Sequence, residues 1–398
     1  MQQYSKLWSV LVLGPLLLAP ILAVEFPRVL AYLPLASLVF GGVILWRAKI
    51  AFTVPKRATS ILIGAIVFLA LSAFVISPSE DAMERFERLL MLLGLGSLFL
   101  WVLFLGRRFT SKKVTWWLMI SCSIGAALTC FEVLSDAMLY EFIRPDVTKE
   151  EYGMAVFNRG ALVITLLSLL VLFVERATRH KAFYLLFLPV LAMLFLVESQ
   201  SSQITAIAGL VFFLFFPVNH KWAWQVFYLL FAVGVLAKPF LVQTIYKNLP
   251  ENIHEQPLLQ EAYVGHRIEI WDFVARKALE KPLVGHGLEF TKTCETFETP
   301  QRFLASNSIL HPHSFILQIW IELGLAGVIG ALILSGYFLM AIFKVSDPVI
   351  RKASLSLFAV SVLVSCFSYG MWQGWWIGLL FIISAIMLSI LPSKEHKA

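Results

Sequence analysis

The stretch from His311 to Gly330 reads H-P-H-S-F-I-L-Q-I-W-I-E-L-G-L-A-G-V-I-G and gives an otherwise apolar helix a polar entrance. Ser314, Gln318 and Glu322 recur every four residues, so in a helix they form one polar stripe. Polar side chains at the start of a membrane-spanning helix are costly unless they are used. The stripe therefore indicates a functional site.

Small residues follow directly behind the stripe. Gly324, Gly327 and Gly330 recur at intervals of three residues. A surface of this kind lets the backbone of a neighbouring helix approach closely. We therefore expect a second helix to pack against these glycines.

The composition is that of a polytopic membrane protein. The 398 residues are 59% hydrophobic and 14% charged, and their mean hydropathy is +0.81. Soluble domains of this length do not have such a composition. Apolar windows predict an all-α fold with about twelve spans. The windows are 7–24, 29–46, 58–76, 86–106, 116–134, 155–174, 181–197, 204–218, 222–242, 315–343, 354–370 and 371–391.

Basic residues set the orientation of these spans. With the N-terminus in the cytoplasm, the cytoplasmic connections carry residues such as Arg47, Arg107 and Arg176. The opposite short loops carry acidic residues such as Glu80 and Asp146. This distribution follows the positive-inside rule, and an even number of spans places both termini in the cytoplasm. The net charge of +7 follows from this topology and gives no reason to expect nucleic acid as a partner. We expect the first apolar run to be a span, because it is longer than a usual signal peptide and lacks a clear A-x-A site.

One connection is far longer than the others. Residues 1–242 hold nine predicted spans, residues 243–312 form a non-cytoplasmic loop of about seventy residues, and residues 313–398 hold three more spans. Within the loop, apolar residues recur with a helical period from Tyr263 to Leu279. This pattern predicts an amphipathic helix inside the long loop.

His313 is the candidate general base. A helix N-terminus disfavours a positive charge, which helps to keep an imidazole neutral. A neutral imidazole can take a proton from an attacking hydroxyl. The alternative is a histidine at the membrane interface that only hydrogen-bonds a carbonyl. His311 is a weaker candidate because it precedes the polar stripe.

Two arginines suit an anionic ligand, since a guanidinium binds phosphate oxygens through two donors. Arg159 lies at the outer entrance of the sixth span and Arg267 begins the loop helix. Arg159 could instead reach lipid headgroups, and Arg267 could lie on a solvated helix face and pair with Glu269 or Asp272. Near Arg267, a tryptophan at position 271 suits the core of the loop helix or an interfacial anchor better than a substrate contact.

Several catalytic patterns do not occur in the sequence. It has no D-x-D, no H-E-x-x-H, no P-loop and no G-x-S-x-G. The four cysteines are scattered and give neither a disulfide framework nor a C-x-x-C pair. We therefore expect no metal and no cofactor, and a site without a metal must stabilise a leaving group with arginines.

From His313 to Val328 the sequence reads H-S-x₉-G-L-A-G-V, and here the chain resembles the bacterial O-antigen ligase and polymerase superfamily. The signature of that family is a periplasmic histidine followed by Asn, Ser or Gln, nine residues and G-x-x-G. Further elements fit the same family: His311-Pro312, Leu317-Gln318, Arg267-x₃-Trp271, Pro282-Leu283-x-Gly285-x-Gly287 and Phe157-Asn158-Arg159-Gly160.

The resemblance implies a GT-C-like glycosyltransferase of the bacterial inner membrane, with its active site facing the periplasm. Such a ligase moves the O-antigen glycan from undecaprenyl diphosphate to lipid A–core oligosaccharide, without nucleotide or metal. Its partners are these two substrates and membrane lipids. His313 would activate the acceptor hydroxyl, Arg159 and Arg267 would bind the diphosphate, and the anomeric centre would invert. Supporting roles would fall to His311, Ser314, Gln318, Glu322, Trp271, Gly324 and Gly327.

Other functions remain open at this point. An O-antigen polymerase and a protein O-oligosaccharyltransferase are close relatives within the same superfamily. A transporter of polyprenyl-linked glycans would belong to another class, and it predicts midplane charges, broken helices and inverted repeats. In this sequence the charges gather towards one membrane face, which favours an enzyme.

Overall fold

The computed structural model describes residues 2–53, 56–111, 113–147, 153–174, 184–250, 264–293 and 312–391. Within these ranges the secondary structure is helical and no strand occurs, which confirms the predicted all-α class. His311 and Cys294 lie outside the described residues.

The N-terminal half of the chain forms a series of helices, several of them interrupted. They are α1 (Gln2–Leu7), η1 (Trp8–Leu13), α2 (Gly14–Leu17), α3 (Ala19–Glu25), η2 (Pro27–Ala31), α4 (Leu33–Arg47), α5 (Lys56–Leu71), η3 (Ser72–Ile76), α6 (Glu80–Gly106), η4 (Arg107–Phe109), α7 (Val114–Leu134), α8 (Met138–Ile143), η5 (Met154–Phe157) and α10 (Asn158–Val174).

The C-terminal half contains the remaining helices. They are α12 (Leu188–Leu196), α13 (Gln200–Phe215), α14 (Lys221–Lys247), α16 (Val264–Glu280), α17 (Phe290–Thr293), α18 (Phe315–Phe343), α19 (Pro348–Ser365) and α20 (Gly374–Ile390). Helix α16 coincides with the stretch in which the sequence pattern predicts an amphipathic helix.

Each of the twelve predicted windows contains a described helix. Nine helical stretches of the described residues are long and apolar enough to cross a membrane, and α13 and α20 are apolar but shorter. In the window 181–197, helix α12 covers only Leu188–Leu196. The chain is therefore a polytopic membrane protein, although length alone supports fewer than twelve crossings.

Helix α10 is the centre of the larger packed core. Every residue from Gly160 to Val171 is buried, as expected for a helix that is apolar on all sides. Its neighbours include α3, α7, α13 and α19. At Gly160, an added Cβ would lie 2.9 Å from the carbonyl oxygen of Ala23, so α3 crosses α10 in close contact. This packing fixes the start of α10, where Arg159 lies.

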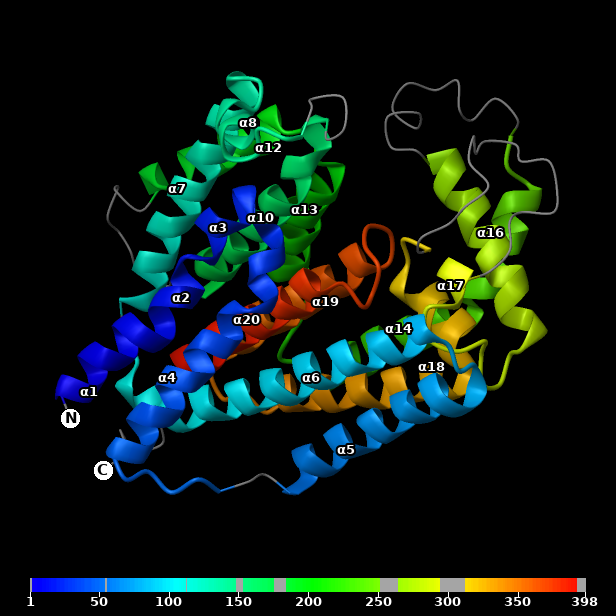
Figure 1. The fold of residues 1–398 in the computed structure, drawn as a ribbon, viewed down its shortest axis with the longest axis horizontal. Helices are drawn as coiled ribbons and strands as arrows, with labels where there is room; N and C mark the ends of the chain where they lie inside the picture. The colour runs from blue at the N-terminus through cyan, green and yellow to red at the C-terminus, as the bar shows by residue number, and fades with distance from the viewer. Residues whose placement is uncertain are drawn as a thin grey trace.

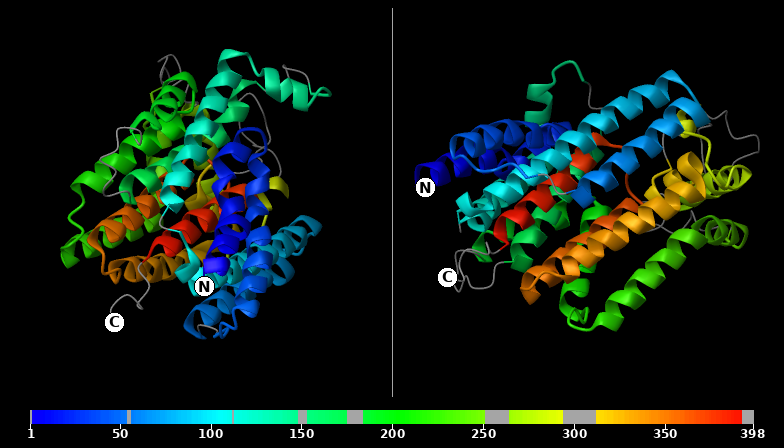
Figure 2. Two further views of the ribbon diagram at one scale, coloured as in Figure 1. Left: turned by 90° about the vertical axis from the view of Figure 1, so that its left-hand side faces the viewer. Right: turned by 90° about the horizontal axis from the view of Figure 1, so that it is seen from below.

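A second core joins α6, α14, α16 and α18. Helix α16 packs on α14 and α18, and it lies with α17 at the end of the molecule opposite to α1 (Figures 1 and 2). Inside α14, Pro239 has no N–H to offer the carbonyl of Val235. The indole of Trp320 on α18 donates to that carbonyl instead, at 2.9 Å.

Helix α18 breaks at Gly324, whose φ of 60° and ψ of −160° are not helical. The break removes two hydrogen bonds that a continuous helix would form, from Leu325 to Ile321 and from Ala326 to Glu322. The loop 281–287 provides a hydrogen-bond partner for each of the two amides and the two carbonyls. Leu325 and Ala326 donate to the carbonyls of Pro282 and Leu283 at 2.7 and 3.0 Å, and the amides of His286 and Gly287 donate to Ile321 and Glu322 at 2.8 and 3.0 Å.

This arrangement differs from the predicted packing of a second helix on the glycines. A Cβ at Gly324 would lie 2.6 Å from backbone atoms of the loop 281–287, so the close neighbour is a loop. At Gly327 an added Cβ would meet Leu323 of the same helix, and at Gly330 nothing lies within 4 Å. The sequence pattern missed the break because the glycine spacing of a helix contact and of a helix interruption look alike.

We expect Gly324→Ala to destabilise the fold. An alanine would have to adopt a positive-φ conformation that essentially only glycine populates, which costs about 1–3 kcal/mol, and its Cβ would press on backbone that cannot rotate away. Gly330→Ala is the matched control on the same helix. It should be neutral or stabilising by up to about 1 kcal/mol. Thermal unfolding of both purified variants in detergent tests this, and equal midpoints would contradict the proposed role of Gly324.

Candidate functional site

His313 lies two residues before α18, between Pro312 and the N-cap residue Ser314. Its backbone is left-handed, with a φ of 47°. The ring Nδ1 lies 3.0 Å from the carbonyl oxygen of Ser368. A carbonyl only accepts hydrogen bonds, so Nδ1 carries the proton and the neutral ring has its lone pair on Nε2. The site thus holds the imidazole in the tautomer that a base requires.

Burial lowers the pKa of His313. The hydrogen bond to Ser368 opposes this shift, and the nearby charge of Arg267 adds to it. The ordinary value is already near 6.5, so His313 is neutral at pH 7. The contact with a carbonyl, which sequence reasoning treated as the alternative to catalysis, uses Nδ1 and is compatible with a base at Nε2.

Trp271 on α16 holds the segment that contains His313. Its indole Nε1 donates to the carbonyl of Pro312 at 2.8 Å. Since Pro312 directly precedes His313, this bond restrains the backbone from which the imidazole projects. This contact adds to the interpretations drawn from the sequence, which were a core residue of the loop helix, an interfacial anchor and, by family resemblance, a supporting role at the site.

Arg159 and Arg267 approach the same phenol, although they lie on different helices and 108 positions apart. Burial raises the pKa of Tyr369 to about 12, and the charges of Arg159 and Arg267 both act against that rise. The guanidinium of Arg159 lies 6.0 Å from the ring centre of Trp375, which in turn meets the ring of Tyr369 edge-on at 4.7 Å. The two arginines and His313 thus form one cluster.

The carboxylates near Arg267 have other partners. Asp272 pairs with Arg276 at 3.0 Å, and Glu269 accepts a hydrogen bond from the hydroxyl of Tyr246 at 3.3 Å. Among the residues that the structure describes, neither Arg159 nor Arg267 forms an ion pair with a carboxylate. Partly buried cations without a counter-ion favour the binding of an anionic ligand.

The loop 366–373, between α19 and α20, joins the parts of this cluster, and sequence reasoning missed it. The predicted windows 354–370 and 371–391 left no room for a loop. It supplies the Ser368 carbonyl to His313 and the Tyr369 phenol to the arginines, and the Ser368 hydroxyl lies 2.7 Å from that of Ser201 on α13. The run S-Y-G-M-W-Q-G-W-W, from Ser368 to Trp376, was the available signal, because glycines and interfacial aromatics interrupt the apolar run.

The polar stripe of α18 anchors this loop. Gln318 donates to Glu322 at 3.1 Å and accepts from the amide of Met371 at 2.7 Å. The indole of Trp372 donates to the second oxygen of Glu322 at 2.5 Å. Ser314 is fully buried, and its hydroxyl has no hydrogen-bond partner in the described part of the chain. Gln318 and Glu322 therefore support the site through the loop.

A second anchor joins the same loop to α6 and α17. Arg85 donates to the carbonyl of Trp372 at 3.0 Å and forms an ion pair with Glu289. Glu289 also pairs with Lys292 at 2.7 Å. The loop 366–373 is thus held by side chains from both α18 and α6.

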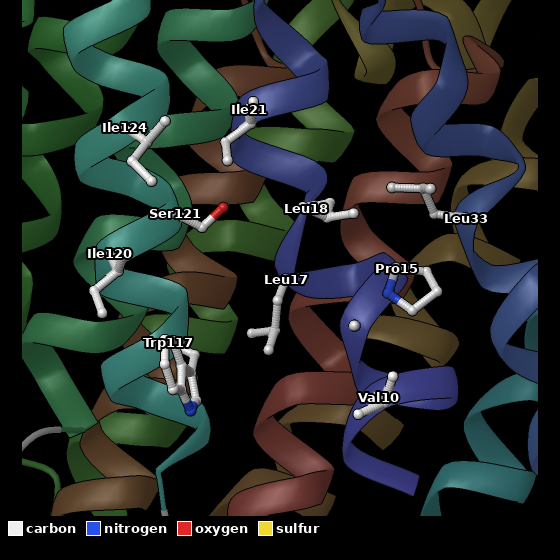
Figure 3. Close-up of a pocket in the computed structure, with 11 residues that line it drawn as sticks. Val10, Pro15, Leu17, Leu18, Ile21, Leu33, Trp117, Ile120, Ser121 and Ile124 are labelled. Carbon is white, nitrogen blue, oxygen red and sulfur yellow. The ribbon is translucent and has the colours of Figure 1, made fainter. Parts of the chain in front are cut away.

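A cavity among the described residues lies elsewhere. It has a volume of about 580 Å³ and is lined by residues of η1, α2, α3, α4 and α7, among them Pro15, Leu18, Leu33 and Trp117 (Figure 3). Apart from the Ser121 hydroxyl and the Trp117 indole, its lining side chains are apolar. None of these lining residues is titratable, so the polar cluster is the better candidate site.

In the described ranges, no group of three or more His, Cys, Asp or Glu side chains could hold a metal ion. Glu198 is exposed. His311 lies outside the described residues.

Part of this cluster lies in a segment that matches a known protein family. Residues 182–332 match the family model described as O-antigen ligase. The match contains Arg267, Trp271, His313 and Gly324, whereas Arg159 and the loop 366–373 lie outside it. No solved structure matches the chain significantly.

Relatives in Rickettsia carry names that propose a polysaccharide ligase. Those of Rickettsia prowazekii and Rickettsia typhi are each 28% identical over 236 residues, and that of Rickettsia felis is 29% identical over 238 residues. Each alignment covers 58% of this chain and 57% of the relative, so the chain spans little more than half the length of these relatives. The family match over residues 182–332, these relatives and the histidine motif all point to the O-antigen ligase superfamily.

Proposed function

We propose that the protein is an O-antigen ligase that transfers a glycan from undecaprenyl diphosphate to lipid A–core oligosaccharide. The main support is that His313, with its lone pair on Nε2, lies in one cluster with Arg159 and Arg267. Among the described residues, neither arginine has a carboxylate partner. A base beside cations suits the transfer of a group from a diphosphate to a hydroxyl. The polysaccharide ligase names of the relatives support the same class of reaction.

In the proposed reaction, Nε2 of His313 takes the proton of an acceptor hydroxyl. The acceptor oxygen attacks the anomeric carbon, and the bond from that carbon to the diphosphate oxygen breaks with inversion. Arg159 and Arg267 bind the diphosphate and stabilise the negative charge that it gains on departure. The hydrogen bond from Nδ1 to Ser368 keeps the ring oriented and stabilises the imidazolium that forms.

The proposed orientation places α16 and the cluster on the periplasmic side of the bacterial inner membrane. The distribution of basic residues supports this orientation, with both termini in the cytoplasm. The diphosphate of a lipid-linked donor lies at the membrane surface, so a cluster at one end of the bundle suits it. A transporter would need its charges near the midplane.

Gene deletion separates the proposed ligase from its nearest alternative. Loss of a ligase should remove the long-chain lipopolysaccharide ladder while the capped carrier lipid accumulates. Loss of an O-antigen polymerase would leave lipopolysaccharide capped with a single repeat. A protein O-oligosaccharyltransferase would leave the ladder intact and remove glycan from protein.

We expect His313→Ala to abolish ligation while the protein still inserts into the membrane. Loss of a general base typically costs about 10²- to 10⁴-fold in rate. The assay is transfer by purified protein from lipid-linked glycan to lipid A–core. His286→Ala is a matched control, because that ring stacks on Phe290 and its Nε2 donates to the backbone carbonyl of Lys277. Near-normal transfer by His313→Ala would refute the assignment of the base.

The pH dependence should differ between the free and the donor-bound enzyme. Arg267 contributes to the lowered pKa of His313, and a bound diphosphate would neutralise that charge. A base is active above its pKa, so the rate should fall as the pH drops through it. We expect the acidic limb of kcat/KM, which reports the free enzyme, below pH 6.5, and the limb of kcat at a higher pH. Coincident limbs would show that Arg267 does not face the bound anion.

Arg267→Lys should be a damaging change. A lysine keeps the charge but loses the two-donor fork that grips a diphosphate. Removal of a transition-state donor typically costs about 3–4 kcal/mol, so Ala should be severely defective and Lys partly so. Arg276→Ala, on the same helix, is the control, because that arginine pairs with Asp272. Wild-type rates for both Arg267 variants would show that Arg267 has only a structural role. The Ala and Lys variants of Arg159 test in the same way whether that side chain binds the diphosphate or only lipid headgroups.

Transfer should need no divalent cation. In the proposed mechanism fixed donors neutralise the departing diphosphate, so EDTA should leave the rate unchanged. Divalent ions also bridge lipopolysaccharide phosphates, so a detergent-soluble acceptor without core phosphates is the required control. Activity on that acceptor that disappears with EDTA and returns with Mg²⁺ would overturn this part of the mechanism. Glu198, Glu322 and Asp272 would then be the first carboxylates to test.

A further inference from the structure

Lys238 is a cation within a membrane-spanning helix, and the mechanism above does not use it. It lies on α14, directly before Pro239, and its side chain is half-buried. Its ammonium lies 4.4 Å from the ring centre of Trp271. In the described part of the structure, no carboxylate pairs with it. Ionisable side chains in such helices are costly and usually functional.

Two contacts place Lys238 beside the cluster. The first is Trp271, which lies one helical turn after Arg267 on the same face of α16 and holds the carbonyl before His313. The second is Cys366, whose thiol and the Lys238 ammonium influence each other electrostatically. Cys366 lies two residues before Ser368, the partner of His313. Lys238 thus lies next to both segments that position His313, which are the turn of α16 with Trp271 and the loop 366–373.

The local backbone fixes this placement. Pro239 frees the carbonyl of Val235, which takes the indole of Trp320 on α18. This bond ties the turn of α14 that contains Lys238 to the half of α18 that follows His313. The backbone from which the Lys238 side chain projects is therefore held in place against α18.

We propose that Lys238 is a third cation of the site and binds the diphosphate of the donor from the side of α14, together with Arg159 and Arg267. This proposal rests on the proposed function. A diphosphate that links a lipid to a sugar carries two negative charges, and three cations stabilise it both when bound and when it gains a further charge on departure. The Lys238 ammonium lies over the face of the Trp271 ring, a contact that uses none of its three N–H donors. Those donors can therefore bond to phosphate oxygens.

The competing interpretation is that Lys238 only braces Trp271. Lys238→Met separates the two, because methionine keeps an unbranched apolar stem that can pack on the ring but has no charge. Lys238→Arg keeps the charge. Lys221→Met, at the exposed start of the same helix, is the matched control for the loss of a lysine. Thermal unfolding of each purified variant shows whether the fold is retained, and Lys238→Gln replaces Lys238→Met if the latter does not fold.

The first measurement is binding of undecaprenyl diphosphate in detergent micelles, with neutral undecaprenol as the reference probe. We expect Lys238→Met to weaken binding of the diphosphate by about tenfold or more, with no effect on undecaprenol. Lys238→Arg should restore most of the affinity, and Lys221→Met should bind like the wild type. In transfer assays Lys238→Met should raise the donor KM more than it lowers kcat.

The outcomes distinguish this proposal from the function on which it rests. If Arg267→Ala loses diphosphate binding but Lys238→Met does not, Lys238 is only a brace and the ligase proposal stands. If the wild type binds undecaprenyl diphosphate no better than undecaprenol, both proposals fail. Equal losses for Lys238→Met and Lys238→Arg would show that the site needs the shape of lysine rather than its charge, and would also overturn the proposal.

Discussion

Glu322 lies in a membrane-spanning helix and has no exposure to solvent. The hydrogen bonds that satisfy its carboxylate determine how the residues of the candidate site are positioned. A buried carboxylate without donors would be very costly. Gln318 and Trp372 supply those donors, and the bond from Trp372 ties α18 to the loop 366–373. That loop presents the Ser368 carbonyl, which sets the tautomer of His313. The polar stripe thus acts on His313 indirectly, through the loop 366–373.

The break in α18 solves a second problem of the same kind. A helix that ends at membrane depth leaves amides and carbonyls that water cannot reach, so another backbone must satisfy them. The loop 281–287 replaces the two missing helical bonds with four of its own. This exchange also fixes the end of α16, because the loop follows directly after that helix. The positions of Arg267 and Trp271 therefore depend on a backbone interaction at Gly324.

The sequence predicted the class of fold, the windows of the helices and the helix in the long loop, because hydropathy and periodicity are local signals. It also selected His313, Arg159 and Arg267, first from their residue types and positions and then from the family resemblance. It could not predict that Tyr369 lies near both arginines or that Ser368 faces His313, since those contacts join segments far apart in the chain. The glycines of α18 were misinterpreted because one spacing is compatible with two backbone structures.

The charges of the cluster have a consequence for the proposed chemistry. Arg267, which binds the diphosphate in the proposed mechanism, also opposes protonation of His313 and so adds to the effect of burial in keeping that imidazole neutral. A carboxylate partner for Arg267 would weaken both effects. The structure instead gives the carboxylates of α16 to Arg276 and Tyr246, on faces that do not serve Arg267. Segregation of the acidic groups from the cluster is thus as necessary to the proposed site as the presence of the arginines.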